Sequence, residues 1–238
     1  MIKLEKTDVY GWEASIRGMR NPLNSWDRSD SYNCKDDDCA FCPYSRDCKA
    51  IEPVDFFIGE NDHDLMMRLA KGGSTHAKYK RMIIVTVDIT GPLYWLKEAD
   101  TYKVGTVANS CSTMHKIHAK EFELSDFSME HLDDLEVCST YNNPTYFTSM
   151  DILKSTIDVL NYHRARYLET KDKHYWWQMI QLLPSTYNQK RTFLFNYEVL
   201  TAMYHDRKNH KLDEWHTFCD WVRSLPYSEL ITGETKEE

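Results

Sequence analysis

Four of the seven cysteines in this 238-residue chain lie within fifteen residues of one another. The residues between them are turn formers and charges, so the cluster is not the apolar face of a packed helix or strand. Four thiolates brought together by short loops form a closed tetrahedral site of the kind that holds structural zinc. We therefore predict an inserted zinc-binding knuckle at about residues 30–50. Its ligands are Cys34, Cys39, Cys42 and Cys48, spaced C-x4-C-x2-C-x5-C.

An iron–sulfur cluster and disulfides are the alternatives to zinc. The pattern begins like the plant-type ferredoxin ligand set, but in that set the fourth cysteine is much further along the chain. Disulfides are disfavoured by the odd number of cysteines and by the start of the sequence, which lacks the apolar run of a signal peptide. No segment approaches the length of a membrane span. We therefore expect a cytoplasmic protein, in which thiols stay reduced.

The composition limits the classes of protein to which the chain can belong. Apolar residues make up 42% and aromatic residues 13% of the sequence, enough for a substantial core. The net charge of −8 at pH 7 argues against general nucleic-acid binding, but it allows a small anionic ligand held by a few local cations. Because no repeat or linker-like stretch is present, we predict one domain over residues 1–230 and a disordered tail at 231–238.

The apolar pattern predicts an α+β fold, with a small antiparallel or mixed sheet in the N-terminal half and a helical second half. The strongest strand signal is 82–89, where a nearly continuous β-branched run predicts burial of both faces. A shorter strand is predicted at 2–5 and a polar loop at 104–115. Helices are predicted at 11–19, 62–71, 93–102, 151–168, 175–183, 193–204 and 212–225.

Candidate ligand-binding residues come from two segments, since no standard catalytic motif is present. The polar loop is rich in small hydroxyl and amide side chains, which let a backbone approach a ligand closely; a capped surface loop is the alternative. Further along, Asn196 lies among apolar residues, where its amide needs a partner from the backbone or from a ligand. Arg207 either meets a ligand or simply favours the C-terminal end of its helix.

Taken together, these segments resemble the flavin-dependent thymidylate synthases over most of the chain, except roughly residues 24–58. The early helix around 14–20, the helix 62–71 with its Gly-Gly turn and the strand 82–89 follow the family in order. The family motif R-H-R-x-x-S-x-N-E-x-S-x-R-Y falls on the polar loop. The residues that match family positions are Asn109 and Ser112 in this motif, then Leu183-Pro184, Asn196, Arg207 and Trp215 in the second half.

This resemblance implies an enzyme that moves a folate methylene group onto deoxyuridylate (dUMP), with hydride from FAD that a nicotinamide cofactor such as NADPH has reduced. It also implies a homotetramer with sites built between subunits. The residues that it implies as contacts are Asn109, Ser112 and Arg207 for the nucleotide and Tyr102, Lys103 and Asn196 for the flavin.

Most of the family's cations are missing from the matched positions. Because arginines bind the phosphates and stabilise charge on the uracil, their loss weakens binding of at least one dianion. Two functions therefore stay open: a divergent flavin-dependent methyltransferase acting on a pyrimidine nucleotide, and a non-catalytic member that binds a nucleotide or a protein. No catalytic residue is assigned. The replacements are Thr101-Tyr102-Lys103 for R-H-R, or Tyr102-Lys103-Val104 if no gap is allowed, Ser110 for the motif's glutamate, Met114 and His115 for its final arginine and tyrosine, Ile180 or Gln181 for the arginine before leucine-proline, Glu198 for the arginine after the helix asparagine, and Arg81 or Met82 for the flavin-contacting histidine.

An oligomer is also expected from the residues themselves. The predicted helices of the second half carry more aromatic surface than one small sheet can cover, and uncovered patches of that size usually mark interfaces. The aromatic residues concerned are Trp176, Trp177, Phe193 and Phe195.

Overall fold

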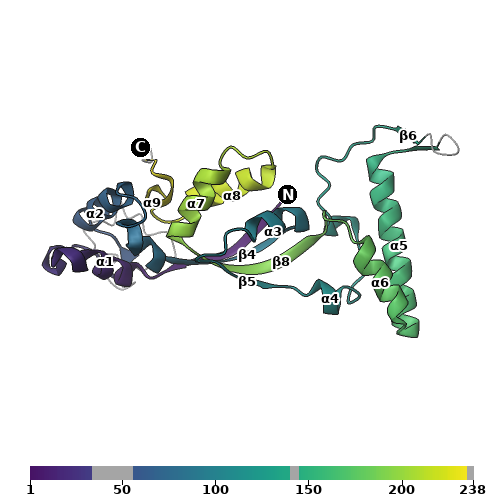
Figure 1. Ribbon diagram of the computed structural model, residues 1–238, viewed down its shortest axis with the longest axis horizontal. Helices are drawn as coiled ribbons and strands as arrows, with labels where there is room; N and C mark the ends of the chain where they lie inside the picture. Colours follow the sequence, from purple (N-terminus) through teal and green to yellow (C-terminus); the bar gives the residue numbers. More distant parts are fainter. Residues whose placement is uncertain (34–55, 140–144, 235–238) are drawn as a thin grey trace, which may run out of the picture. The chain divides into compact units, whose positions relative to one another are not determined.

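A four-stranded sheet organises the protein, with strands in the order β1-β4-β8-β5 (Figure 1). The computed structural model describes residues 1–33, 56–139 and 145–234. Two residue pairs identify β4 and β8 as antiparallel, since the backbone N–H of Leu93 donates to Tyr187 and that of Tyr197 donates to Ile83. The strand bounds are β1 Lys3–Tyr10, β4 Ile84–Pro92, β5 Val107–Ser110 and β8 Asn188–Asn196.

Strand β8 corrects the prediction of a wholly helical second half and of a helix over 193–204. Its side chains alternate between buried and less buried positions, which is the period of a strand. The rings of Phe193 and Phe195 lie on one face and stack with centroids 5.1 Å apart. The helix α7, Tyr197–Arg207, begins only after Asn196. Both phenylalanines are therefore buried within their own chain, and they do not supply the oligomer surface expected of them.

Strand β4 is confirmed as a strand, although it starts two residues later than predicted and extends through Pro92. Val85, Val87 and Ile89 are fully buried, whereas the alternate side chains are only partly buried. One of these, Asp88, accepts a 2.6 Å hydrogen bond from the Thr192 hydroxyl. The expectation that both faces are covered by apolar packing is therefore wrong for this strand.

The remaining elements follow the predicted order, with short additions; two of these, β5 and α4 (Thr113–Lys116), lie inside the segment 104–115 that was predicted as a loop and correct that prediction. The α5 helix starts at a capping box in which Thr148 and Asp151 bond to each other's backbone N–H groups. The bounds are α1 Trp12–Arg20, η1 Asn21–Leu23, η2 Trp26–Arg28, β2 Tyr32–Asn33, β3 Phe56–Phe57, α2 Glu60–Lys71, η4 Ala77–Met82, α3 Leu93–Ala99, α4 Thr113–Lys116, η5 Leu124–Asp126, β6 Val137–Ser139, β7 Thr145–Phe147, α5 Ser149–Thr170, α6 Lys173–Leu182, α8 Asp213–Ser224 and α9 Glu229–Thr232.

The chain divides into two compact units, and each of the four sheet strands has residues in both. The first unit comprises Met1–Lys3, Thr90–Asp100 and Ser110–Arg191. Its core lies where α5 and α6 pack against each other and against the segment that follows α4. The core residues are Ile117, Phe122, Phe127, Leu153, Ile157, Leu160 and Met179. The single domain over residues 1–230 stays a prediction.

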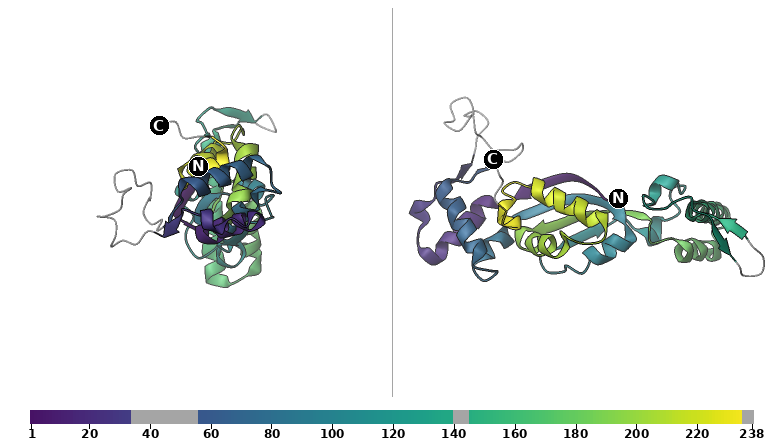
Figure 2. Two further views of the ribbon diagram at one scale, coloured as in Figure 1. Left: turned by 90° about the vertical axis from the view of Figure 1, so that its left-hand side faces the viewer. Right: turned by 90° about the horizontal axis from the view of Figure 1, so that it is seen from above.

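The second unit comprises Leu4–Ile89, Thr101–Asn109 and Thr192–Glu238. Within it, α7 and α8 cover one face of the strands (Figure 2). Phe218 of α8 packs edge-on against Phe195, and the Trp221 indole donates a 3.0 Å hydrogen bond to Thr7 of β1. These aromatic contacts hold α8 on the sheet.

The predicted zinc ligands Cys34, Cys39, Cys42 and Cys48 lie outside the described residues, so the zinc site stays a prediction. Within the described ranges, no group of three or more His, Cys, Asp or Glu side chains is placed to hold a metal ion. Cys111 and Cys219 are free thiols. Among the described helices, none is long and apolar enough to cross a membrane.

Candidate functional site

Arg207 lies in the last turn of α7, against two aromatic rings of the second unit that meet each other edge-on with centroids 6.3 Å apart. The guanidinium carbon is 4.8 Å from the centre of the Trp215 ring and 5.5 Å from that of Tyr102. Its Nε donates a 2.9 Å hydrogen bond to the Tyr102 hydroxyl, which in turn donates to Asp206 at 3.2 Å. Guanidinium groups bind such ring faces favourably. The stack therefore fixes the position of a half-buried positive charge.

Tyr102 is protonated at neutral pH in this setting. Burial raises the pKa of its hydroxyl, Arg207 lowers the pKa and Asp206 raises it, and the net direction is upward. The tyrosine thus serves as a neutral hydrogen-bonding group that links Arg207 to the 101–106 loop.

The same loop touches the other end of α7 through Gly105 and Asn196. Gly105 has a φ of +80°, and a Cβ atom there would lie 2.5 Å from Asn196 Nδ2. Glycine is required for both the backbone angle and the close approach. The Oδ1 atom of Asn196 accepts a 2.9 Å hydrogen bond from the Val199 N–H, which caps α7. The backbone partner predicted as one alternative for this amide is therefore the one that the structure contains.

The other sequence candidates belong to both units. Lys103 and Asn109 are exposed, the latter on β5 of the second unit. Ser112 belongs to the first unit, and its hydroxyl accepts a 3.0 Å hydrogen bond from the His115 N–H as the cap of α4. The structure thus joins Tyr102 to Arg207 by direct contact, and Asn196 to the same loop through Gly105.

Glu198, at the position of a family arginine, is paired with Arg81. Its carboxylate accepts hydrogen bonds from Arg81 Nε at 2.6 Å and Nη2 at 3.0 Å. The bidentate pair leaves this end of α7 without an added positive charge. Beside it, burial lowers the pKa of Lys80 to about 8, even though Glu198 raises it, and the ammonium donates to the Thr201 hydroxyl at 3.4 Å.

Several residues of this site escaped the sequence reasoning. The sequence-based predictions do not include Asp206, Gly105 or buried Lys80, nor Thr106, whose buried hydroxyl has no hydrogen-bond partner among the described residues. A lone glycine in a polar loop is a signal for a positive φ and could have drawn attention to Gly105. Nothing in the local sequence distinguishes Lys80 from its exposed neighbours.

The residues matched to the flavin side do not fit a flavin pyrophosphate by themselves. The Tyr102 hydroxyl bonds to Arg207 and Asp206, and Asn196 Oδ1 caps a helix. Lys103 is then the one exposed cation among the three residues. A pyrophosphate needs more positive charge than this set supplies.

Solved structures of similar fold cover nearly the whole chain. Thymidylate synthase X (ThyX) from Helicobacter pylori, with FAD and dUMP, aligns over 100% of both chains with a TM-score of 0.62 and 15% sequence identity. The UMP/dUMP methylase PolB from Streptomyces cacaoi, bound with 5-Br dUMP, aligns over 98% of this chain and 95% of its own, with a TM-score of 0.56 and 12% identity.

No protein-family profile matches the sequence, and no curated protein matches it. The structural likeness therefore carries the comparison, and at such low identity it establishes the fold alone. The chain has the fold of the flavin-dependent thymidylate synthase ThyX.

Proposed function

We propose that the protein binds a pyrimidine nucleotide against the segment 101–109, which leads into β5, and against the C-terminal end of α7. The observation that carries this proposal is the Arg207 guanidinium held against the Tyr102 and Trp215 rings on a fold shared with structures that contain dUMP or 5-Br dUMP. In the proposal, Arg207 pairs with the phosphate or a base carbonyl, and exposed Asn109 adds a hydrogen bond. Ser112 stays a predicted nucleotide contact.

Two versions of this function differ in chemistry. In the first, the protein is a divergent methyltransferase that uses FAD, folate and NADPH. In the second, it binds the nucleotide without catalysis. The Arg81–Glu198 pair favours the second, because it neutralises the position where the resemblance predicts an arginine. Absorbance of the purified protein near the flavin bands distinguishes the two, and a yellow protein would favour the enzyme.

The proposal also retains three expectations that the resemblance and the sequence supply. These are a homotetramer, a cytoplasmic location and a structural zinc ion. Trp177 supports an oligomer, because it is 43% exposed on α6 and remains available to an interface. A monomer in light scattering at micromolar concentration would contradict the oligomer.

Replacing Arg207 with alanine is expected to weaken nucleotide binding by about 10- to 150-fold, the equivalent of roughly 1.5–3 kcal/mol for losing one charge-assisted contact. The measurement is a thermal-shift series with dUMP, UMP and FAD. A nucleotide at about 100 times its dissociation constant adds about 2.7 kcal/mol of stability to wild type. Because the substitution also removes stacking on Tyr102 and Trp215, each variant is compared with its own ligand-free state.

Two further variants sharpen this experiment. Lys208→Ala removes a charge from the neighbouring exposed residue and should leave the ligand shift unchanged. Arg207→Lys keeps the charge but loses the planar fork, so its shift should be intermediate. If neither nucleotide shifts wild type, the nucleotide proposal fails and a protein partner becomes the better function. Equal losses of nucleotide affinity in the Arg207→Ala and Lys208→Ala variants would also contradict the nucleotide proposal.

For the cysteine cluster, we expect about one zinc ion per chain in freshly purified, reduced protein. Asn33 and Phe56, the described residues on either side, are paired across the antiparallel β2–β3 ladder. A metal that closes the intervening segment would therefore stabilise this ladder, because metal binding is coupled to folding. Cys39→Ser should lower both zinc content and the unfolding temperature, whereas Cys111→Ser, at an exposed free thiol, should change neither. Metal analysis that finds neither zinc nor iron in wild type would rule the site out.

A further inference from the structure

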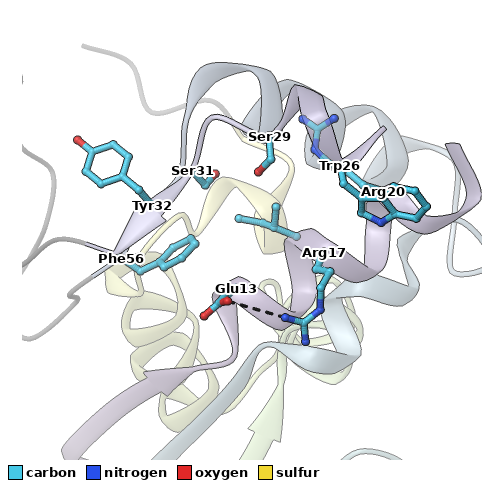
Figure 3. A pocket seen from close by; sticks show the side chains of 9 residues that line it. Glu13, Arg17, Arg20, Trp26, Ser29, Ser31, Tyr32 and Phe56 are labelled. Carbon is cyan, nitrogen blue, oxygen red and sulfur yellow. Dashed lines mark ion pairs between the residues drawn. The ribbon is translucent and has the colours of Figure 1, made fainter. Parts of the chain in front are cut away.

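A separate cavity of about 260 Å³ lies in the second unit beside α1 (Figure 3). One wall is a single face of α1, formed by Glu13, Arg17 and Arg20 at helical spacing. The opposite wall comes from the segment 26–32 and from Phe56. None of these residues belongs to the proposed nucleotide site, so an inference from this cavity goes beyond the proposed function.

Arg20 brings a buried positive charge with spare donors to the cavity. Its side chain is 4% exposed, and Nε donates a 2.5 Å hydrogen bond to Asp62. Nη1 donates to the backbone oxygen of Ser25 at 3.1 Å and to its hydroxyl at 3.3 Å. Within the described part of the chain, Nη2 donates to no residue. Arg20 lines the cavity, and a buried guanidinium with an unused pair of N–H groups is suited to an oxygen anion.

The other polar groups of the cavity determine which charge it accepts. The hydroxyls of Ser29 and Ser31 donate to Asp62 at 2.7 and 2.6 Å, so their hydrogens are turned away from a ligand. Asp62 offsets the charge of Arg20, which leaves Arg17 and Glu13 as the remaining pair. Arg17 Nη1 lies 3.8 Å from Glu13 Oε1, and both side chains are largely exposed. Because an exposed ion pair contributes little free energy, Arg17 can turn away from Glu13 and towards a ligand at little energetic cost.

The remaining lining residues are apolar or aromatic. Ile16 and Phe56 are buried and form the inner surface. Trp26 is 51% exposed and its indole N–H donates to Asn21 at 2.8 Å, which holds the ring in place. A fixed, half-exposed aromatic ring next to guanidinium groups suits a flat ring that carries an anionic group.

We propose that this cavity binds a small planar molecule bearing an oxyanion, with Arg17 and Arg20 Nη2 on the anion and the ring against Trp26, Phe56 and Ile16. Carboxylate and phosphate share the geometry that a guanidinium fork recognises. The volume lies just below the roughly 300–1,000 Å³ of drug-sized sites, so a single ring with one anionic group is the expected size.

The probes are benzoate and phenyl phosphate, which carry the same ring with different anions, and neutral benzyl alcohol. Binding is followed by calorimetry and by the indole N–H resonance of Trp26 in protein labelled with nitrogen-15 tryptophan, assigned with Trp26→Phe. The better anionic probe should bind with a dissociation constant on the order of 0.1–1 mM, as expected for so few atoms. If benzoate binds more tightly than phenyl phosphate, the natural ligand carries a carboxylate; if phenyl phosphate binds more tightly, it carries a phosphate. Benzyl alcohol should bind at least about tenfold more weakly, in line with the loss of a charge-assisted contact.

The test variant is Arg17→Ala, chosen because Arg20 is buried against Asp62 and its loss would disturb folding. The Arg17→Ala substitution should weaken the binding of the anionic probe by about fivefold or more, as expected for the loss of one partly exposed charge-assisted contact. Arg28→Ala removes an exposed charge from the same region but not from the cavity, and it should leave binding unchanged. The proposal is overturned if neither anion shifts the Trp26 resonance, if benzyl alcohol binds as well as the anions, or if the two arginine variants behave alike.

Discussion

Replacing Asp62 with asparagine is expected to lower the free energy of unfolding by about 3–5 kcal/mol, because it leaves a buried arginine without its counter-ion. Asp62 is fully buried near the start of α2. Its Oδ1 atom accepts from Arg20, and its Oδ2 atom accepts from the Ser29 and Ser31 hydroxyls and from the backbone N–H groups of Asp30 and Ser31. In the asparagine variant, the side-chain NH2 group would replace one of these oxygens. It would then face groups that can only donate hydrogen bonds or already donate them, and it could accept none of their bonds.

The network is reciprocal, which makes its loss more damaging. The carboxylate of Asp30 accepts from the backbone N–H groups of Asn61 and Asp62 at 2.9 and 3.1 Å. The Asp62 carboxylate thus binds the segment 29–31, while the Asp30 carboxylate binds the first turn of α2. We expect the Asp62→Asn substitution to loosen both together.

Thermal and urea unfolding measure this loss, with Asp64→Asn as the matched control on an exposed position of the same helix. The Asp62 variant should lose roughly 10 °C in midpoint temperature, given about 2–4 °C per kcal/mol for a chain of this size. The control should stay within about 0.5 kcal/mol of wild type. Similar stabilities for the two variants would mean that the Arg20–Asp62 pair contributes little.

The same carboxylate makes stability depend on pH. Burial by itself raises the pKa of Asp62, but hydrogen bonds from Ser31, Ser29 and Arg20 outweigh burial and hold the pKa below its usual value. Because the folded pKa is the lower one, the stabilisation is complete above the unfolded value and is lost as the pH falls through the folded value. The difference between wild type and the variant should therefore be constant above about pH 5 and shrink below about pH 4.

Replacing Phe195 with alanine is expected to lower the free energy of unfolding by about 3–5 kcal/mol, the usual range for truncating a buried phenylalanine side chain. Phe195 is 1% exposed. Its ring stacks on Phe193 at 5.1 Å and meets Phe218 and Trp221 at 6.1 and 6.4 Å. These neighbours come from β8 itself and from α8, so the cavity left by the substitution would lie between the sheet and the helix that covers it.

Leu194→Ala is the matched control, because successive side chains of a strand point to opposite faces. Leu194 is only partly buried, so we expect the Leu194→Ala variant to lose less than half as much free energy of unfolding as the Phe195→Ala variant. Phe193→Ala should resemble Phe195→Ala. In urea unfolding, large effects at 193 and 195 with a smaller one at 194 are the signature of a strand. Large effects at 193 and 197 with a small one at 195 would instead match the helix that the sequence pattern predicted.

The sequence by itself determined the elements whose signals are local. The predicted helix 93–102 matches α3, which starts directly after Pro92, and the predicted helix 151–168 matches α5, which starts two residues earlier behind the capping box of Thr148 and Asp151. The β-branched run of β4 is another such signal. The order of elements and the resemblance to the ThyX fold followed from these signals and their spacing, and the structural comparison confirmed that fold.

Only the tertiary structure decided the features that depend on distant partners. The run around Phe193 suits a helix or a strand locally, and pairing with β4 made it a strand. Asn196 could have met a ligand or the backbone, and the start of α7 at Tyr197 made it a cap. Arg207 meets Tyr102 across 105 residues, Arg81 meets Glu198 across 117, and Arg20 meets Asp62 across 42. Charges so far apart in the chain carry no mark of their pairing, because their free energy of interaction exists only after folding has brought them together and removed water from around them.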